Sequence, residues 1–129
     1  MLRVTGIDHV NLNVRNLQET AEFYQRLFGF HVKKREYEQN GLIIGNDTIS
    51  LCLYEHPELN VSDNVGFNHF GFHIDNFSEI LTICQQMGVE VLYGGPIEWE
   101  QSRSIYIKDP NGYTIELSEV WSGGLTINQ

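Results

Sequence analysis

The chain has 129 residues, of which 41% are hydrophobic, and this is enough for one domain with a substantial core. Its net charge of −9 argues against a nucleic-acid-binding protein, because contacts with phosphates need a basic surface. The N-terminus lacks the apolar stretch of a signal peptide, and no apolar run approaches the length that crosses a membrane, so we expect a cytoplasmic protein without a membrane partner.

The first expected element is a strand over residues 8–14, DHVNLNV, in which apolar and polar residues alternate strictly. Its polar face consists of His9, Asn11 and Asn13. A helix is expected to begin after Asn16, a good N-cap with Glu19 three residues later, and to end at Gly29, the residue type favoured just past a helix. Three strand-like segments complete this half, at 30–38, 42–45 and 48–54.

The second half repeats this order of elements. The segment NHFGFHI at 68–74 alternates in the same way, with His69, Gly71 and His73 on its polar face. The next helix is expected to begin after Asn76, again with a glutamate three residues on, and to end at Gly88. Strand-like segments follow at 89–93, 102–108 and 113–120, the last two joined by a DPNG turn.

This repetition predicts an internal duplication within a single domain over residues 1–129. The two βαβββ modules would cover about residues 5–55 and 65–120. We expect an α+β fold in which the modules form a curved, partly closed mixed sheet with the helices outside. The apolar face of each first strand would meet its helix, and the polar face would lie on the concave side.

Two histidines and a glutamate stand out on the predicted polar faces. His9 and His69 occupy matching positions in the two modules, and Glu116 lies on the polar face of the last predicted strand. Each residue considered alone would more often be structural or simply exposed. Together, two imidazoles and a carboxylate are a typical set of metal ligands that leaves positions for water or substrate. We therefore predict one divalent metal ion held by these three residues.

Four pieces of the sequence carry a resemblance to a known superfamily: GIDHVNLNV, ETAEFYQRLFGF, NHFGFHID and SRSIYIKDPNGYTIELSE. They resemble the vicinal oxygen chelate superfamily, which includes glyoxalase I, extradiol dioxygenases, fosfomycin-resistance enzymes and bleomycin-binding proteins. The resemblance covers about residues 5–120. The paired βαβββ modules of that family match the repeat, and its metal ligands fall on His9, His69 and Glu116. A fourth ligand used by some members falls on Cys52, a cysteine for which a small core residue is the alternative role.

The resemblance implies a metal-dependent enzyme that acts on a small substrate chelated through two neighbouring oxygens. The reaction would be dioxygenase-like or lyase-type, with Fe²⁺, Mn²⁺, Ni²⁺ or Zn²⁺ as the metal. One alternative is a fosfomycin-type enzyme that opens an epoxide. Another is a metal-free drug-binding module similar to the bleomycin-resistance proteins. Members of this size often pair, so we also expect a homodimer.

Further residues are expected around the metal. Tyr106 matches a tyrosine that lines the active site in two branches of the family, and a packing role is the alternative. His73 is the candidate acid–base histidine, with a hydrogen-bonded structural role as the alternative. We expect the substrate to be contacted by Asn11, Asn13, Ser104 and Arg103. The mouth of the site would be lined by Trp99, Trp121 and Tyr54.

Overall fold

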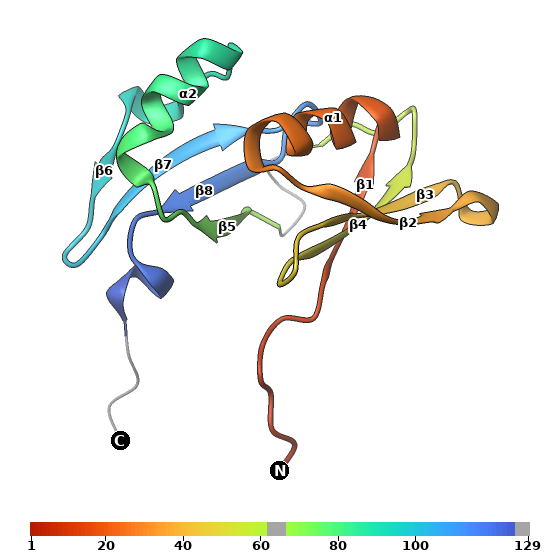
Figure 1. Cartoon of the computed structure of the whole chain (residues 1–129), viewed down its shortest axis with the longest axis horizontal. Coiled ribbons are helices and arrows are strands. Elements are labelled where there is room, and N and C mark those ends of the chain that lie inside the picture. Colours follow the sequence, from red (N-terminus) through yellow and green to blue (C-terminus); the bar gives the residue numbers. More distant parts are fainter. Residues whose placement is uncertain (62–66, 126–129) are drawn as a thin grey trace. The chain divides into compact units, whose positions relative to one another are not determined.

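The computed structural model describes residues 1–61 and 67–125 and divides into two compact units, residues 1–60 and 61–129. The predicted start of the second module, near residue 65, lies outside the described residues. Each unit contains a four-stranded sheet with one α-helix on one side of it (Figure 1). Among the described residues, no helix combines the length and the apolar character needed to cross a membrane.

The first unit runs from a parallel strand pair to an antiparallel meander. Its elements are β1 (Val10–Val14), α1 (Leu17–Phe28), β2 (His31–Glu36), the 3₁₀ turn η1 (Tyr37–Gln39), β3 (Gly41–Gly45) and β4 (Ser50–Glu55). The strands are ordered β1-β4-β3-β2. The β1–β4 pair is parallel, and the other two pairs are antiparallel.

The second unit has the same strand order and directions. Its elements are β5 (His69–His73), η2 (Phe77–Glu79), α2 (Ile80–Met87), η3 (Leu92–Gly94), β6 (Ile97–Glu98), β7 (Arg103–Lys108), β8 (Thr114–Ser118) and η4 (Trp121–Gly124). The strands are ordered β5-β8-β7-β6, with β5 and β8 parallel. The predicted α+β fold with duplicated βαβββ order is therefore confirmed. Its strands are hydrogen-bonded as two sheets of four, one for each unit, rather than as one continuous sheet.

The helix ends follow the capping residues, with one difference between the units. In α1 the Asn16 side chain accepts the Glu19 N–H at 2.8 Å, and Gly29 ends the helix at φ 71°. In the second unit Asn76 instead donates from its side chain to the Glu79 carboxylate at 2.8 Å. The first turn there is a 3₁₀ turn, so α2 begins only at Ile80.

The predicted strand at 89–93 is wrong. Only Val91 makes a bridge, to Ile107, and the chain then turns through η3. Tyr93 has φ 57°, and the two glycines that follow it also have positive φ, which no strand can accommodate. The outer strand of this sheet is β6, which has two residues.

Strict alternation gives each sheet one buried apolar face. In the first unit this face includes Leu12, Val14, Leu51 and Leu53, which are almost inaccessible. In the second unit it includes Ile105, Ile107, Ile115 and Leu117. Because side chains alternate between the two sides of a strand, the intervening polar residues all lie on the opposite face.

Candidate functional site

The polar face of the second sheet brings His69 and Glu116 together. His69 lies on β5 and Glu116 on β8, and the His69 Nε2 atom is 2.9 Å from Glu116 Oε1. Directly opposite Glu116 on β5 is Gly71, which has no side chain to cover the carboxylate. Both side chains are partly accessible, 32% for His69 and 21% for Glu116. The pair is therefore held by the sheet yet remains open to a ligand.

The second carboxylate oxygen of Glu116 is held by serines. Ser104 Oγ on β7 donates to Oε2 at 2.7 Å, and Ser118 Oγ makes a longer bond of 3.3 Å to the same atom. Ser104 in turn accepts a hydrogen bond from the Trp99 indole Nε1 at 2.9 Å. Ser104 is only 1% exposed, so it contacts the glutamate rather than solvent.

Electrostatics keep this carboxylate ionised. Burial alone would raise the pKa of Glu116, but hydrogen bonds with Ser104, Tyr106 and His69 outweigh it, and the pKa lies below its ordinary value. Burial, together with the hydrogen bond to Glu116 and its negative charge, raises the pKa of Tyr106 to about 12. At neutral pH Glu116 is therefore an acceptor and Tyr106 is a hydrogen-bond donor.

The residue before each predicted histidine ligand orients its ring. Asn68 Oδ1 lies 2.6 Å from Nδ1 of His69, and Asp8 Oδ2 lies 2.8 Å from Nδ1 of His9. A ring whose Nδ1–H donates to such an oxygen leaves Nε2 with a free lone pair, the form in which histidine binds metals. Sequence analysis overlooked Asp8 and Asn68, although they occupy the same place in the two repeats.

In the first unit, His9 stands immediately before β1, and the register fixes the neighbours of that strand. Asn11 is paired with Cys52, and Asn13 with Tyr54. Since Gly71 is paired with Glu116 in the second unit, Cys52 is the positional counterpart of Glu116. Burial and the carboxylates of Asp8 and Glu36 raise the pKa of the Cys52 thiol, which therefore stays protonated at neutral pH.

The predicted ligand set draws on both units. The second unit brings together two of the three residues, and His9 belongs to the first unit. In the part of the chain that the structure describes, no group of three or more histidine, cysteine or acidic side chains is assembled for a metal ion. The three-ligand centre thus stays a prediction.

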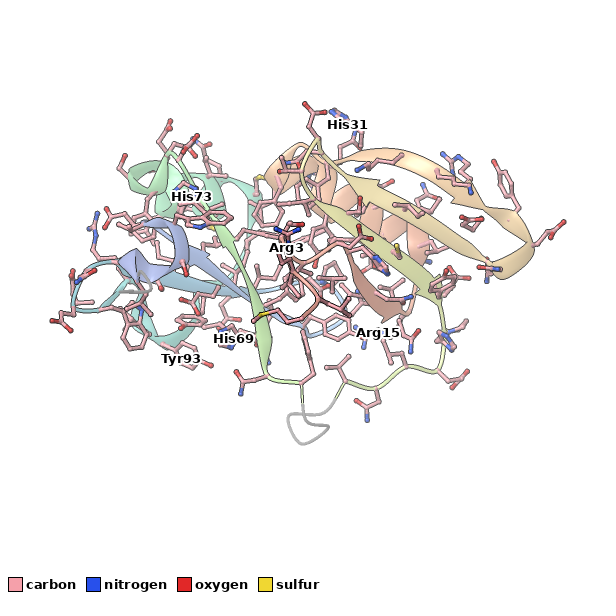
Figure 2. The ribbon with its side chains drawn as sticks, turned by 90° about the horizontal axis from the view of Figure 1, so that it is seen from below. Arg3, Arg15, His31, His69, His73 and Tyr93 are labelled. Atoms are coloured by element: carbon pink, nitrogen blue, oxygen red, sulfur yellow. The ribbon has the colours of Figure 1, made fainter. Side chains whose placement is uncertain are left out.

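The other predicted site residues of the second unit are divided between the two faces of its sheet. Tyr106 and His73 lie on the face of Glu116: the Tyr106 ring packs edge-on against His69 at 5.6 Å, and the His73 ring against Trp121 at 5.9 Å. Figure 2 shows His69 and His73 along the same strand. Arg103 lies on the opposite face.

Arg103 is engaged there by two other residues. Its guanidinium makes two bonds to the Glu119 carboxylate, at 2.6 and 3.2 Å, and lies 5.0 Å above the centre of the Phe77 ring. The sequence pattern already indicates this placement. Side chains alternate along a strand, so Arg103 points to the same side as the buried Ile105 and away from Tyr106. Its pairing with Glu119 keeps the Arg103 guanidinium away from the polar face.

Tyr93 is a further residue of this face that sequence analysis did not identify. Its ring packs against Tyr106 at 5.4 Å, and the side chain is 71% exposed. Figure 2 shows it on the side of His69. A tyrosine at φ 57° is unusual, and such backbone strain is concentrated at functional sites. The signal in the sequence was the Gly94–Gly95–Pro96 run, which indicates a turn at this point rather than a strand.

Comparison with known proteins agrees with this architecture. The profile of the Glyoxalase/Bleomycin resistance protein/Dioxygenase superfamily matches residues 6–117. The chain belongs to this superfamily. A solved structure of similar fold is the integron cassette protein HFX_CASS4 from the mobile metagenome of the Halifax Harbour sewage outfall. It is 27% identical, has a TM-score of 0.72, and the match covers 91% of this chain and all of that one.

Curated relatives within the superfamily carry different names. The metallothiol transferase FosB of Staphylococcus epidermidis is 26% identical over 121 residues, 90% of this chain and 82% of its own length. The lactoylglutathione lyase GLX1 of Arabidopsis thaliana is 29% identical, with 84% of this chain and 42% of its own length covered. The catechol-2,3-dioxygenase of Bacillus subtilis is 27% identical, with coverage of 88% and 41%. The chain thus spans most of FosB but less than half of the other two.

Proposed function

We propose that this superfamily member is an enzyme that uses one divalent metal ion, held by His9, His69 and Glu116, to act on a small substrate with two neighbouring oxygens. The observation that carries the proposal is the 2.9 Å approach of His69 Nε2 to Glu116 Oε1 on an accessible face. Two ligand atoms, each about 2.1 Å from one ion, lie about 3.0 Å apart at the right angle of an octahedral site and about 3.4 Å apart at a tetrahedral angle. The donor pair therefore fits a shared metal.

The hydrogen bonds of His69 also favour a cation at this point. Both ring nitrogens face side-chain oxygens, Nδ1 that of Asn68 and Nε2 that of Glu116. A neutral imidazole carries one N–H and satisfies only one of these acceptors. Either a second proton or a metal ion at Nε2 would satisfy both, with the Nδ1–H directed to Asn68. The metal is the version we propose, because Nε2 and the Glu116 oxygen are both partly accessible. For His9 the Asp8 carboxylate would play the same orienting part.

The bound metal would supply Lewis-acid polarisation of the chelated oxygens. Two neutral histidines and one carboxylate leave a net positive charge on a divalent centre, which attracts an anionic oxygen pair despite the acidic chain. Tyr106, whose pKa is raised to about 12, would turn its one O–H from Glu116 to a substrate oxygen once the metal ion binds the carboxylate. His73, on the same face of β5, is the proposed acid–base group.

The substrate would have an apolar remainder. Three exposed aromatic side chains each contact a residue of the polar face: Tyr93 on Tyr106, Trp99 on Ser104 and Trp121 on His73. Such rings accommodate apolar or aromatic groups next to a polar anchor. A dioxygenase-like or lyase-type reaction is the version we favour, and Asn11 and Asn13 would contribute further hydrogen bonds from the first module.

Epoxide opening of the fosfomycin type is the second candidate, and the match over 82% of the length of FosB favours it. A phosphonate would need cations beside the metal. Arg103 lies on the other face of the sheet and is paired with Glu119, which leaves Lys108 as the cationic residue of β7 on the polar face. In the first unit Lys33 Nζ donates to Ser50 Oγ at 2.8 Å, on the face of Cys52. The second unit, which holds His69 and Glu116, thus offers a phosphonate one cation on β7, and this favours the first candidate.

Metal analysis of the purified full chain tests the proposal. We expect near-stoichiometric binding of Fe²⁺, Mn²⁺, Ni²⁺ or Zn²⁺, abolished by H69A or E116Q. The matched controls are H31A and E119Q, which remove a histidine on the outer strand β2 of the first sheet and a glutamate that is paired with Arg103. A chain that binds no divalent metal would exclude a metal enzyme, and equal binding in all four variants would refute His69 and Glu116 as its ligands.

The rival is a metal-free binding module of the bleomycin-resistance kind. Turnover of catechols, epoxides or glutathione hemithioacetals that stops on adding a chelator would favour the enzyme, whereas binding of a drug-like ligand unaffected by chelator would favour the module. We further propose that the protein acts as a homodimer, which light scattering of the purified chain would test.

A further inference from the structure

A chain of hydrogen bonds connects an exposed indole to the glutamate of the proposed metal site. Trp99 Nε1 donates to Ser104 Oγ at 2.9 Å, and Ser104 Oγ donates to Glu116 Oε2 at 2.7 Å. We infer that Ser104 and Trp99 are positioning residues that fix which oxygen of Glu116 faces the metal. This inference rests on the proposed function, because it concerns the presentation of a proposed ligand.

Within this chain of hydrogen bonds, Ser104 donates its one proton and accepts one hydrogen bond. A hydroxyl has one proton, and accepting the Trp99 N–H on a lone pair leaves that proton free to point at Glu116. The 1% exposure of Ser104 keeps water from competing for either bond. Ser104 was predicted to contact the substrate, but its position buried behind the carboxylate favours this orienting role instead.

The consequence is an asymmetric carboxylate. Oε2 of Glu116 accepts from Ser104 and, more weakly, from Ser118 at 3.3 Å, whereas Oε1 faces His69 Nε2. Tyr106 also hydrogen-bonds this carboxylate. We assign Oε1 to the metal ion because it is the oxygen that faces the proposed ligand His69. Ligation through this single atom would keep the remaining metal positions for the substrate. A carboxylate freed from Ser104 can rotate and offer both oxygens, which changes the number of open positions.

Trp99 is held over the sheet by the short turn between β6 and β7. Its backbone N–H donates to the Ser102 carbonyl at 2.8 Å, and this places the indole above Ser104. The side chain is still 52% exposed, so burial alone does not account for its position. The same indole thus lies at the rim of the polar face and is coupled through one hydroxyl to the proposed ligand.

Titration of the metal-free full chain with Zn²⁺, and separately with Mn²⁺, by calorimetry tests this inference. Loss of an outer hydrogen-bonding partner typically weakens metal affinity by about 10- to 100-fold, and we expect this for S104A. S104T keeps the hydroxyl and should restore affinity to within about 3-fold of the wild-type value. W99F removes one neutral hydrogen bond and should weaken binding by about 2- to 10-fold.

Two further variants separate positioning from general damage. S102A removes another buried serine hydroxyl, one that bonds the backbone of Val120 and Arg103 and does not contact Glu116. W121F removes the other tryptophan. S102A should bind metal like the wild type, and W121F leaves Trp99 as the one tryptophan and so serves as a fluorescence reporter. In W121F, the emission of the remaining Trp99 should also change on metal addition, and in W99F the change should be much smaller.

The outcomes keep the two proposals apart. If the wild-type chain binds neither metal, the proposed function fails. If the wild type binds and S104A, W99F and S102A all bind equally well, the metal site stands and the positioning role is refuted. If S104A folds poorly, S104T and W99F still test the positioning role. That role requires W99F to bind metal more weakly than S104T.

Discussion

Replacing Glu116 by glutamine should remove the stabilisation that a divalent metal gives to the fold. A ligand that binds only the folded state adds RT ln(1 + [L]/Kd) to the free energy of unfolding, about 2.7 kcal/mol at 100 times Kd. Loss of a direct ligand should weaken affinity by more than the about 100-fold seen for outer partners. At the same metal concentration, the metal then adds less than about 0.4 kcal/mol to the free energy of unfolding of E116Q.

The metal-free proteins supply the baseline for this measurement. Glu116 accepts hydrogen bonds as an ion and is only 21% exposed, so E116Q should cost about 1–2 kcal/mol even in chelator. Chemical unfolding of wild type, E116Q and the control E119Q, each with and without Zn²⁺, separates the two effects. If metal stabilises wild type and E116Q equally, Glu116 is not a metal ligand. If metal stabilises E119Q less than wild type, the loss in E116Q is not specific to Glu116.

Three other predictions use the same unfolding measurements. H9A should lose the metal-dependent stabilisation as fully as E116Q, and D8A should lose part of it; retention in H9A would remove the first module from the site. Because the folded pKa of Glu116 lies below its ordinary 4.5, its ionised form adds stability above that pH, and this is lost as the pH falls through the folded pKa. The difference between wild type and E116Q in chelator should therefore be largest at neutral pH and shrink below pH 4.5, and a difference that grows in acid would contradict the lowered pKa. G45A should destabilise the first unit by at least about 1–3 kcal/mol, because Gly45 has φ 155° and an added Cβ would lie 1.8 Å from the Ile49 carbonyl oxygen; an unchanged unfolding midpoint would show that this turn tolerates a side chain.

Much of the fold was predictable because its signals are local. Alternation over Val10–Val14 and His69–His73 set the two faces of each first strand, and Asn16 with Gly29 set both ends of α1. The strand prediction at 89–93 was wrong because it relied on the apolar residues of that segment. The chain turns there instead, with positive φ at Tyr93 and the two glycines that follow. The second helical segment also begins after Asn76, as predicted, but its first turn is a 3₁₀ turn, and the Asn76 side-chain amide donates to the Glu79 carboxylate instead of capping a backbone N–H.

The site was predictable to the extent that it depends on strand parity. His69, Tyr106 and Glu116 share a face because their side chains alternate with buried apolar residues on the three strands. The parallel pairing of β5 with β8 brings His69 and Glu116 into contact. Arg103 was expected near the substrate because of its charge, although its position in the strand places it on the buried side with Ile105. The bonds from Asp8 and Asn68 depend on side-chain geometry at strand entrances, which no periodicity reveals.

The two modules share a strand order but differ in how well they stabilise a carboxylate at the matching position. Glu116 is flanked across its strand by Tyr106 and near it by Ser104, both of which bond the carboxylate. The corresponding neighbour of Cys52 on β3 is Ile43, which offers no donor. At Cys52, burial and the carboxylates of Asp8 and Glu36 disfavour a negative charge more than Lys33 favours it, whereas a neutral thiol carries no charge to be disfavoured. This asymmetry favours a centre with one carboxylate rather than two, and hence a net positive charge where an anionic oxygen pair would bind.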